Sequence, residues 1–258
     1  SEGMTSLRQD IRDLEAVKNI FKLYQPEIVF HMAAQALVRY SYLNPVETYE
    51  TNVMGTMNIL EGIRSINTVR AAVIVTSDKC YKNIEKDRGY SEDEPMGGHD
   101  PYSSSKGAAE LLISSYRNSY YSVDNYDEHK TAIASVRAGN VIGGGDWAKD
   151  RLIPDIIKHI YSNKKFVLRS GSSIRPWQHI LDVIYIYASI AKFTKESLYD
   201  SFFSTMAEDI NIVLPTGEER KVSRVKQIPI DITFTCPVTL ELRVGATSQF
   251  ALKDTLSP

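Results

Sequence analysis

The chain has 258 residues with 30 Lys and Arg against 32 Asp and Glu, and this near-neutral balance argues against a nucleic-acid binder held by bulk charge. With 43% hydrophobic and 24% charged residues, the composition is that of a soluble globular protein with an apolar core. No apolar run approaches the roughly 20 residues that span a bilayer, and residues 1–15 lack the apolar stretch of a signal peptide. The two cysteines, Cys80 and Cys236, cannot form a disulfide framework or a zinc cluster, so we expect no metal site and a reducing, cytoplasmic setting.

Apolar residues spaced by three and four alternate along the chain with short apolar runs. The first pattern is typical of amphipathic helices and the second of buried strands. In chain order this predicts a helix over 14–24, a strand over 27–34, a helix over 45–66, a strand over 71–76, a loop over 83–101, a helix over 102–120, a strand over 131–137, and helices over 152–162 and 181–195. Strands and helices in alternation imply an α/β fold, a Rossmann-like doubly wound parallel sheet with crossover helices.

Both ends of the chain depart from this alternation. No strand and no glycine-rich dinucleotide turn precede the first helix, so we expect the sheet to be truncated at its N-terminus. From about residue 201 the alternation stops. Residues 228–234 and 238–244 then alternate apolar with polar or small side chains, which predicts a β-hairpin around 235–237.

Two polar groups are the candidates for chemistry. Tyr102 and Lys106 are four residues apart, so a helix places them on one face, where the ammonium favours the phenolate. Ser77, Asp78 and Lys79 follow a strongly apolar strand, at the end of a parallel sheet where ligands bind. The plainer alternative is that Ser77 and Asp78 only cap the next turn. By spacing alone Tyr102/Lys106 is also an ordinary solvated pair, since the same spacing occurs at Tyr126/Lys130 and Tyr161/Lys165.

Further residues fit a binding site, each with a structural alternative. His31 ends a strand beside small residues, although a lone histidine there is more often a hydrogen-bonded core residue. Asn52 lies within a predicted helix, where it can simply bond to a neighbouring loop. The glycine-rich loop 140–146 suits a phosphate or sugar, or merely a tight turn. Arg175 suits a phosphate, or is a surface arginine.

Several stretches together resemble the extended short-chain dehydrogenase/reductase family, specifically its nucleotide-sugar 4,6-dehydratases, over about residues 4–200. The pair Asp78-Lys79 is similar to the branch of these dehydratases that acts on CDP-glucose, because the branch acting on dTDP-glucose carries Asp-Glu there. The stretches are DIRD (10–13), QPEIVFHMAAQALV (25–38), NPVETYETNVMGT (44–56), TSDKCY (76–81), EPMGGHDPYSSSKGAAEL (94–111), SVRAGNVIGGGDWAKDRLIPDII (135–157) and IRPWQHILD (174–182).

The resemblance implies a hydro-lyase that converts CDP-glucose to CDP-4-keto-6-deoxyglucose. In such an enzyme Tyr102, as a phenolate near Lys106, removes the proton from the sugar O4 while C4 gives a hydride to NAD. Ser77 hydrogen-bonds O4. Lys79 helps to remove the C5 proton, and protonated Asp78 assists loss of the C6 hydroxyl as water. The hydride then returns to C6.

The resemblance also implies binding residues, domains and partners. An NAD-binding domain over 1–139 is followed by a partial substrate-binding region over 140–200 and a tail over 201–258. We expect a homo-oligomer paired through helices 46–66 and 102–120, a nucleotide-sugar substrate, and neither nucleic acid nor membrane as a partner. The expected NAD contacts are Asp10, Ile11, Met32, Ala33, Ala34, Gln35, Thr51, Thr76, Tyr102 and Lys106, and the expected contacts to the sugar nucleotide are Asn140, Arg151 and Arg175.

The chain departs from the family at both ends. The family begins with a strand and a glycine-rich turn that cradle the pyrophosphate, so their absence here predicts weak or no activity for the chain alone. Residues 201–258 do not resemble the family's remaining lobe, and we interpret them as a shifted reading frame or an altered terminus. Two alternatives stay open: another NAD-dependent nucleotide-sugar epimerase or dehydratase, and a non-catalytic remnant unable to hold NAD.

Overall fold

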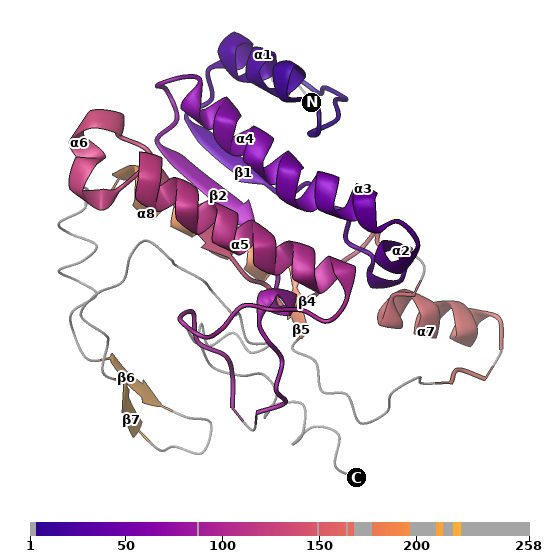
Figure 1. Ribbon diagram of the computed structural model, residues 1–258. Helices are drawn as coiled ribbons and strands as arrows, with labels where there is room; N and C mark the ends of the chain where they lie inside the picture. The colour runs from indigo at the N-terminus through magenta and orange to yellow at the C-terminus, as the bar shows by residue number, and fades with distance from the viewer. Residues whose placement is uncertain are drawn as a thin grey trace.

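The computed structural model describes residues 4–86, 88–148, 150–163, 165–167, 177–196, 210–213 and 219–222 (Figure 1). Its central sheet has three parallel strands, β1 (Ile28–His31), β2 (Ala71–Val75) and β3 (Ala132–Val136), in the order β1-β2-β3. Ile28 lies opposite Ala71, and Ala71 opposite Ala132, so the three strands begin at the same level. All three were predicted from their apolar runs.

Helices α1 (Leu14–Tyr24), α4 (Gly55–Arg64) and α5 (Pro101–Tyr120) cover one face of this sheet (Figure 1). Their apolar side chains, including Phe21, Leu60 and Ile113, form one buried cluster with Ile74 and Ile133 of the sheet. Burial of this face is the main force that holds the three helices in place. Helix α1 ends at Tyr24, as predicted, and the left-handed backbone of the next residue, Gln25 (φ 46), stops it.

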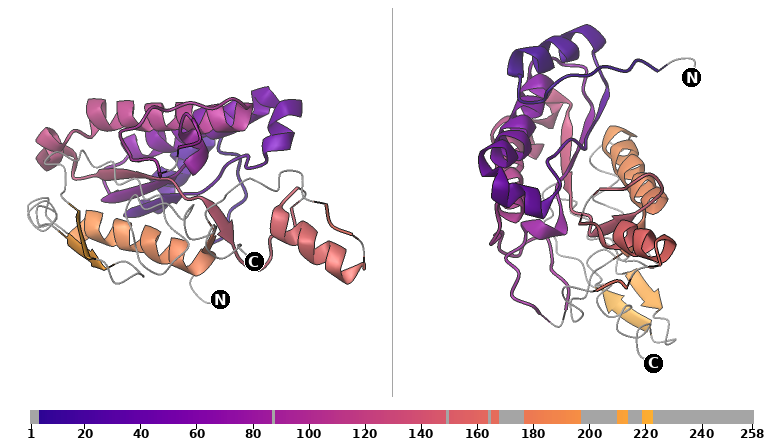
Figure 2. Two further views of the ribbon diagram at one scale, coloured as in Figure 1. Left: turned by 90° about the horizontal axis from the view of Figure 1, so that it is seen from below. Right: turned by 90° about the vertical axis from the view of Figure 1, so that its right-hand side faces the viewer.

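Helix α8 (Ile180–Glu196) covers the other face (Figure 2). Val183, Ile186 and Ile190 pack there against Val73 and Val136. The strands therefore alternate their side chains between two apolar layers, which explains why β2 and β3 are almost uniformly apolar. Helices on both faces of a parallel sheet confirm the Rossmann-like α/β fold.

The long helix predicted over 45–66 is interrupted. It consists of α3 (Pro45–Tyr49), a π-helical turn η1 (Glu50–Met54) and α4, with Pro45 in the first turn as expected. A separate short helix α2 (Val38–Leu43) precedes it and was not predicted. A single π-helical turn is too short to disturb the spacing of apolar residues. The sequence pattern therefore predicts one helix where the backbone has three segments.

The remaining elements are short. Strands β4 and β5 pair in parallel and were not predicted, because three residues are too few to show a pattern. Strands β6 and β7 form an antiparallel pair, whereas the hairpin predicted around 235–237 lies outside the described residues. Among the described helices, none is long and apolar enough to cross a membrane. The bounds are η2 (Asp78–Cys80), η3 (Val123–Asn125), α6 (Tyr126–His129), β4 (Asn140–Ile142), α7 (Leu152–Tyr161), β5 (Trp177–His179), β6 (Ile210–Val213) and β7 (Glu219–Val222).

Candidate active site

The first turn of α5 is fixed by its own cap. Asp100 accepts hydrogen bonds from the Ser103 main-chain nitrogen (2.9 Å) and hydroxyl (2.6 Å), and Pro101 occupies the first helical position. The main-chain nitrogen of Tyr102 donates to the hydroxyl of Ser41 in α2, at 3.1 Å. Tyr102 is therefore held in the first turn by contacts to both its helix cap and a neighbouring helix.

Lys106 lies one turn further along α5 with 5% of its surface exposed. Its ammonium donates to the main-chain oxygen of Val75, the last residue of β2, at 3.3 Å. Burial lowers the pKa of Lys106 to about 8, while the negative charge of Glu110 acts in the opposite direction. The ammonium thus stands at the end of β2 with most of its water removed.

Tyr102 is also buried, and burial raises the pKa of its phenol. A hydrogen bond with the Ser77 side chain lowers that pKa, the Asp78 carboxylate raises it, and the charge of Arg151 lowers it. The net pKa is raised, so in this structure the phenol is the resting form. The expected stabilisation of the phenolate by the Lys106 ammonium is not among the main causes of this shift, which is dominated by the desolvation cost of a buried phenolate.

Ser77, Asp78 and Lys79 form a compact polar turn at the end of β2. The Ser77 hydroxyl lies 3.0 Å from Asp78 Oδ1 and accepts from the Lys79 main-chain nitrogen at 3.2 Å. The Lys79 ammonium lies 3.6 Å from Asp78 Oδ2. The Asp78 main-chain nitrogen donates to Ala138 beyond β3, at 3.1 Å. Ser77 is therefore the cap of η2, as the plainer alternative predicted, and at the same time a partner of Tyr102.

At the end of β1, His31 is buried and its Nε2 lies 3.0 Å from the Thr56 hydroxyl. Burial, followed by the nearby charge of Lys106, lowers the pKa of His31 to about 4, so this histidine is neutral at ordinary pH. It is a hydrogen-bonded core residue that borders the candidate site. Directly after it, Met32 and Ala33 are exposed.

Asn52 joins the loop after β1 to helix α5: the bond to a neighbouring loop was expected from the sequence, and the bond to α5 was not. It is 1% exposed, and its Oδ1 accepts from the Gln35 main-chain nitrogen at 2.8 Å. Its Nδ2 donates to the Gln35 oxygen (3.0 Å) and to the Ser105 hydroxyl (2.8 Å). Ser105 precedes Lys106, so Asn52 couples the expected cofactor loop to the Tyr–Lys helix.

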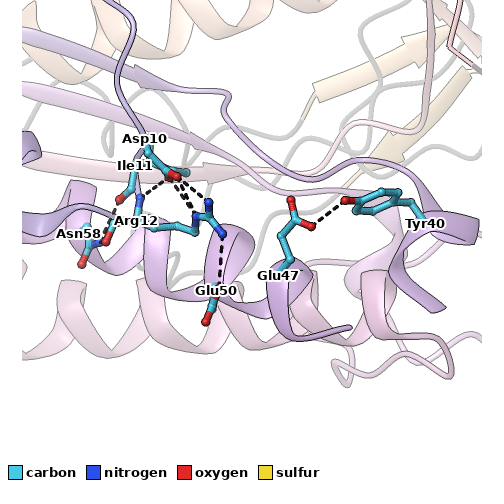
Figure 3. A network of polar contacts seen from close by, with 7 residues as sticks. All are labelled: Asp10, Ile11, Arg12, Tyr40, Glu47, Glu50 and Asn58. Carbon is cyan, nitrogen blue, oxygen red and sulfur yellow. Dashed lines mark hydrogen bonds and ion pairs between the residues drawn. The ribbon is translucent and has the colours of Figure 1, made fainter. Parts of the chain in front are cut away.

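Asp10 and Ile11 lie at the start of a network drawn in Figure 3. The Asp10 carboxylate accepts from the Arg12 guanidinium, with the shortest contact 2.7 Å. The Asn58 side chain of α4 donates to the main-chain oxygens of Ile11 and Arg12, at 2.9 and 3.0 Å. A second bond of Arg12 reaches Glu50 at 3.4 Å. The segment is therefore pinned to η1 and α4, and the Asp10 carboxylate is engaged by Arg12.

The other expected site residues are more scattered. The Thr76 hydroxyl donates to the buried carboxylate of Glu110, whose charge also raises the pKa of Lys106. Thr51 lies half-buried in η1, and Asn140 opens β4 opposite Trp177. Arg175 lies outside the described residues. Arg151 precedes α7, where its Nε lies 3.9 Å from Asp146.

The two other Tyr–Lys pairs, Tyr126/Lys130 and Tyr161/Lys165, lie at the surface, as expected for ordinary solvated pairs. Lys130 stands over the ring of Tyr126 at 5.6 Å, in a short helix. Tyr161 is 87% exposed and ends α7, so Lys165 falls beyond the helix. No group of three His, Cys, Asp or Glu side chains within the described ranges could hold a metal ion.

The arrangement can perform acid–base chemistry on a polar ligand. A phenol, a hydroxyl, a carboxylate and two ammonium groups converge where β2 meets the first turns of α5. Groups with hydroxyl and ammonium donors suit an oxygen-rich ligand such as a sugar. Sequence reasoning identified these five residues, and it missed Glu110, whose position one turn after Lys106 was the available signal.

Comparison with known proteins gives several 4,6-dehydratases among the relatives. The family model described as GDP-mannose 4,6 dehydratase matches residues 1–212. CDP-glucose 4,6-dehydratase from Salmonella typhimurium is 56% identical over 183 residues, which are 71% of this chain and 51% of that protein. Human dTDP-D-glucose 4,6-dehydratase is 28% identical over 187 residues, 72% of this chain and 50% of that protein. The chain thus spans about half the length of these curated relatives.

Solved structures agree on the fold. UDP-glucose 4-epimerase from Thermus thermophilus, in complex with NAD, has a TM-score of 0.62 and 25% identity, covering 77% of this chain and 62% of that one. A dTDP-glucose 4,6-dehydratase from Streptomyces venezuelae, with NAD and TYD bound, has a TM-score of 0.61 and 24% identity, covering 71% and 53%. Because the family model covers most of the sequence, the chain belongs to the GDP-mannose 4,6 dehydratase family.

Proposed function

We propose that the protein is an NAD-dependent 4,6-dehydratase of CDP-glucose, a hydro-lyase that forms CDP-4-keto-6-deoxyglucose. The observation that carries the proposal is the meeting of the Ser77-Asp78-Lys79 turn with Tyr102. The 56% identity to a Salmonella protein of that name supports the choice of CDP-glucose over other nucleotide sugars.

The residues present fit the nicotinamide half of NAD. The Lys106 ammonium has three N–H donors, and the structure gives it one acceptor among the described residues, the Val75 oxygen. The remaining donors suit the hydroxyls of a ribose. Exposed Met32 and Ala33 offer small or flexible side chains at the end of β1, where a flat ring can approach. We therefore keep the expected NAD contacts as a proposal, Asp10, Ile11, Ala34, Gln35, Thr51 and Thr76 among them.

In the first half of the reaction Tyr102 removes the proton from the sugar O4, and Ser77 holds O4 by a hydrogen bond. When bound, NAD supplies the hydride acceptor for C4, the donor for C6, and a positive charge beside the Tyr102 phenol. That phenol has a raised pKa here, so its ionisation depends on positive charge nearby, to which Arg151 contributes. Asn140, Arg151 and Arg175 would hold the sugar nucleotide.

In the second half Lys79 and Asp78 perform the elimination. The two groups are in contact as an ion pair, and their neutral form is an amine beside a carboxylic acid. In that form Lys79 takes the C5 proton, and Asp78 gives its proton to the departing C6 hydroxyl, which leaves as water. The elimination returns Lys79 to the ammonium and Asp78 to the carboxylate, so the pair ends as it began.

The test is product formation from CDP-glucose. The chain is incubated at high concentration with saturating NAD, and the 4-keto sugar is followed by its ultraviolet absorbance in base. We expect slow formation that the Tyr102→Phe variant abolishes and the matched surface variant Tyr161→Phe leaves unchanged. Product formation that Tyr102→Phe leaves unchanged would overturn the proposal. A faster reaction with dTDP-glucose or UDP-glucose would show that the substrate is that nucleotide sugar, while the proposed 4,6-dehydration would stand.

The wider predictions from the sequence remain proposals. Pairing of two copies through helices 46–66 and 102–120 is supported by large apolar side chains exposed on these elements, Val46 and Leu111 among them. Cytoplasmic location rests on the sparse cysteines, of which Cys80 is free and buried. The division at residues 139/140 and 200/201 also stays a prediction. The experiment for pairing is the mass in solution of the chain and of Leu111→Glu.

A further inference from the structure

Glu110 is the buried carboxylate around which the candidate site is assembled. It is 3% exposed and lies on α5, one turn after Lys106 and two turns after Tyr102. Its Oε1 accepts from the Thr76 hydroxyl at the end of β2. Its Oε2 accepts from the Ser135 hydroxyl of β3, at 2.9 Å.

A buried cation completes the arrangement from the end of β3. Arg137 is 2% exposed, and its Nη2 donates to Glu110 Oε2 at 3.0 Å. The guanidinium also donates to the main-chain oxygen of Glu92 (3.2 Å) and stands over the Tyr81 ring at 4.9 Å. The carboxylate of Glu110 therefore bonds to residues at the ends of β2 and β3, and its bond to Thr76 lies next to Ser77 of the proposed site.

We propose that Glu110 is a positioning residue for the proposed dehydratase reaction: it fixes α5 against the ends of β2 and β3 and supplies the negative charge that faces Lys106. The inference rests on the proposed function for its catalytic consequence alone. The bond to Thr76 sets the distance between the Ser77-Asp78-Lys79 turn and Tyr102. The charge offsets part of the cost of keeping the Lys106 ammonium out of water.

The titratable groups near Lys106 come from three elements. Glu110 and Tyr102 lie on its own helix, His31 ends β1, and Cys80 lies in η2. Arg137 faces Glu110 from beyond β3. His31 is neutral at ordinary pH and burial raises the pKa of the Cys80 thiol, so both are uncharged. Glu110 is therefore the anion that acts on Lys106 among these groups.

A purely structural role for Glu110 makes the opposite prediction for Lys106. If Glu110 only ties the elements together, its loss admits water and the pKa of Lys106 rises toward the value of 10.5 for an exposed lysine. If the charge acts as proposed, its loss lowers the pKa of Lys106 below about 8. The direction of the change separates the two roles.

The experiment is a ¹³C NMR titration of the Lys106 ε-carbon in the full chain labelled with ¹³C-lysine, its signal assigned by its loss in Lys106→Arg. We expect the Glu110→Gln midpoint to fall by about one pH unit. Ser135→Ala is the matched control, because it removes one bond to Glu110 and keeps the charge. Ser135→Ala should leave the Lys106 midpoint at its wild-type value. Glu110→Asp, which keeps the negative charge, should have a midpoint close to the wild-type value. An unchanged or higher midpoint in Glu110→Gln overturns the proposal.

The double variant Glu110→Gln/Arg137→Gln covers the case in which Glu110→Gln leaves Arg137 unpaired and does not fold. A neutral amide pair removes the buried unpaired charge, and the Lys106 midpoint should still fall. These titrations need no substrate, so a chain without dehydratase activity still tests the role of Glu110. Where turnover is measurable, the upper pH limb of kcat should move down with the midpoint in Glu110→Gln and stay in place in Ser135→Ala.

Discussion

The Lys106 ammonium lies 3.3 Å from the main-chain oxygen of Val75, so a charged group of α5 ends inside the protein at the last residue of β2. One hydrogen bond does not replace the hydration that an ammonium loses on burial. The site thus keeps a destabilising group where the proposed chemistry needs positive charge, and this has a measurable consequence for folding.

Lys106→Met should stabilise the chain at neutral pH. Because burial lowers the pKa of Lys106 to about 8, the unfolded chain binds more protons than the folded one between pH 8 and 10.5. The free energy of unfolding therefore rises through this window, and below it the folded state carries the full cost. Methionine removes that cost, up to about 3 kcal/mol at pH 7. Urea denaturation at pH 7 and 10 should show a gain that shrinks as pH rises. The variant Lys22→Met, at an exposed position, should show neither the gain in stability nor its dependence on pH. A loss of stability in Lys106→Met at pH 7 would contradict the prediction.

His31 predicts a loss of stability in acid. Its pKa is lowered from 6.5 to about 4, so the unfolded chain binds the proton first as the pH falls. Stability should decrease from pH 6.5 down to about 4, by about 3 kcal/mol from this residue. His31→Gln should flatten that part of the curve, while exposed His99→Gln should follow the wild-type curve. Denaturation midpoints at pH 7, 5.5 and 4.5 provide the test, and parallel curves for all three proteins would refute it.

Gly98 controls the first turn of α5. A Cβ there would lie 2.5 Å from the main chain of Ser103 and Ser104, whereas one at Gly144 would meet nothing within 4 Å. Gly98→Ala should therefore cost about 1–3 kcal/mol and shift the turn that carries Tyr102. Gly144→Ala should change little. Thermal melting and turnover of both variants provide the check, and equal behaviour of the two would show that the turn adapts.

Lys79 can be separated from the oxidation step by isotope exchange. Under the proposed mechanism, Lys79→Met keeps O4 deprotonation by Tyr102, but removal of the C5 proton should slow by about 10²–10⁴-fold. Mass spectrometry of the sugar after incubation in D₂O reports deuterium at C5. The matched variant Lys82→Met, at an exposed position beyond η2, should exchange at the wild-type rate. Exchange at that rate in Lys79→Met as well would assign the base elsewhere.

The strands and long helices could be predicted because their signals are local. The apolar runs of β2 and β3 and the cap of α5 at Asp100 each lie within one segment of sequence. The same holds for the proposed site, because the end of a buried strand and a Tyr–Lys pair at helical spacing are both visible in the sequence. Their meeting follows from the parallel sheet, whose strand ends face one edge.

The supporting contacts could not be predicted in the same way. Glu110 and Arg137 are charged residues that, from sequence alone, belong on a surface, and only the crossing of α5 over β3 brings them together in the interior. Asn52 and Gln35 are 17 positions apart, and their mutual bonds depend on the width of the turn at η1. Such contacts depend on three-dimensional placement, which no spacing rule encodes.

The π-helical turn at Glu50–Met54 changes the direction in which side chains point along a helical segment that packs against two other helices, α5 and α1. Each residue of an α-helix advances the side-chain direction by about 100°, so one extra residue in a turn rotates everything after it by that amount. The segment before the turn packs against α5, and the segment after it packs mainly against α1 and also touches α5. Deleting one residue between 50 and 54 would restore an even helix and turn Leu60 and Ile63 away from Phe21. The segment 45–64 therefore packs against both α5, the helix that carries Tyr102 and Lys106, and α1. The wide turn at Glu50–Met54 sets how these two sets of contacts are oriented relative to each other.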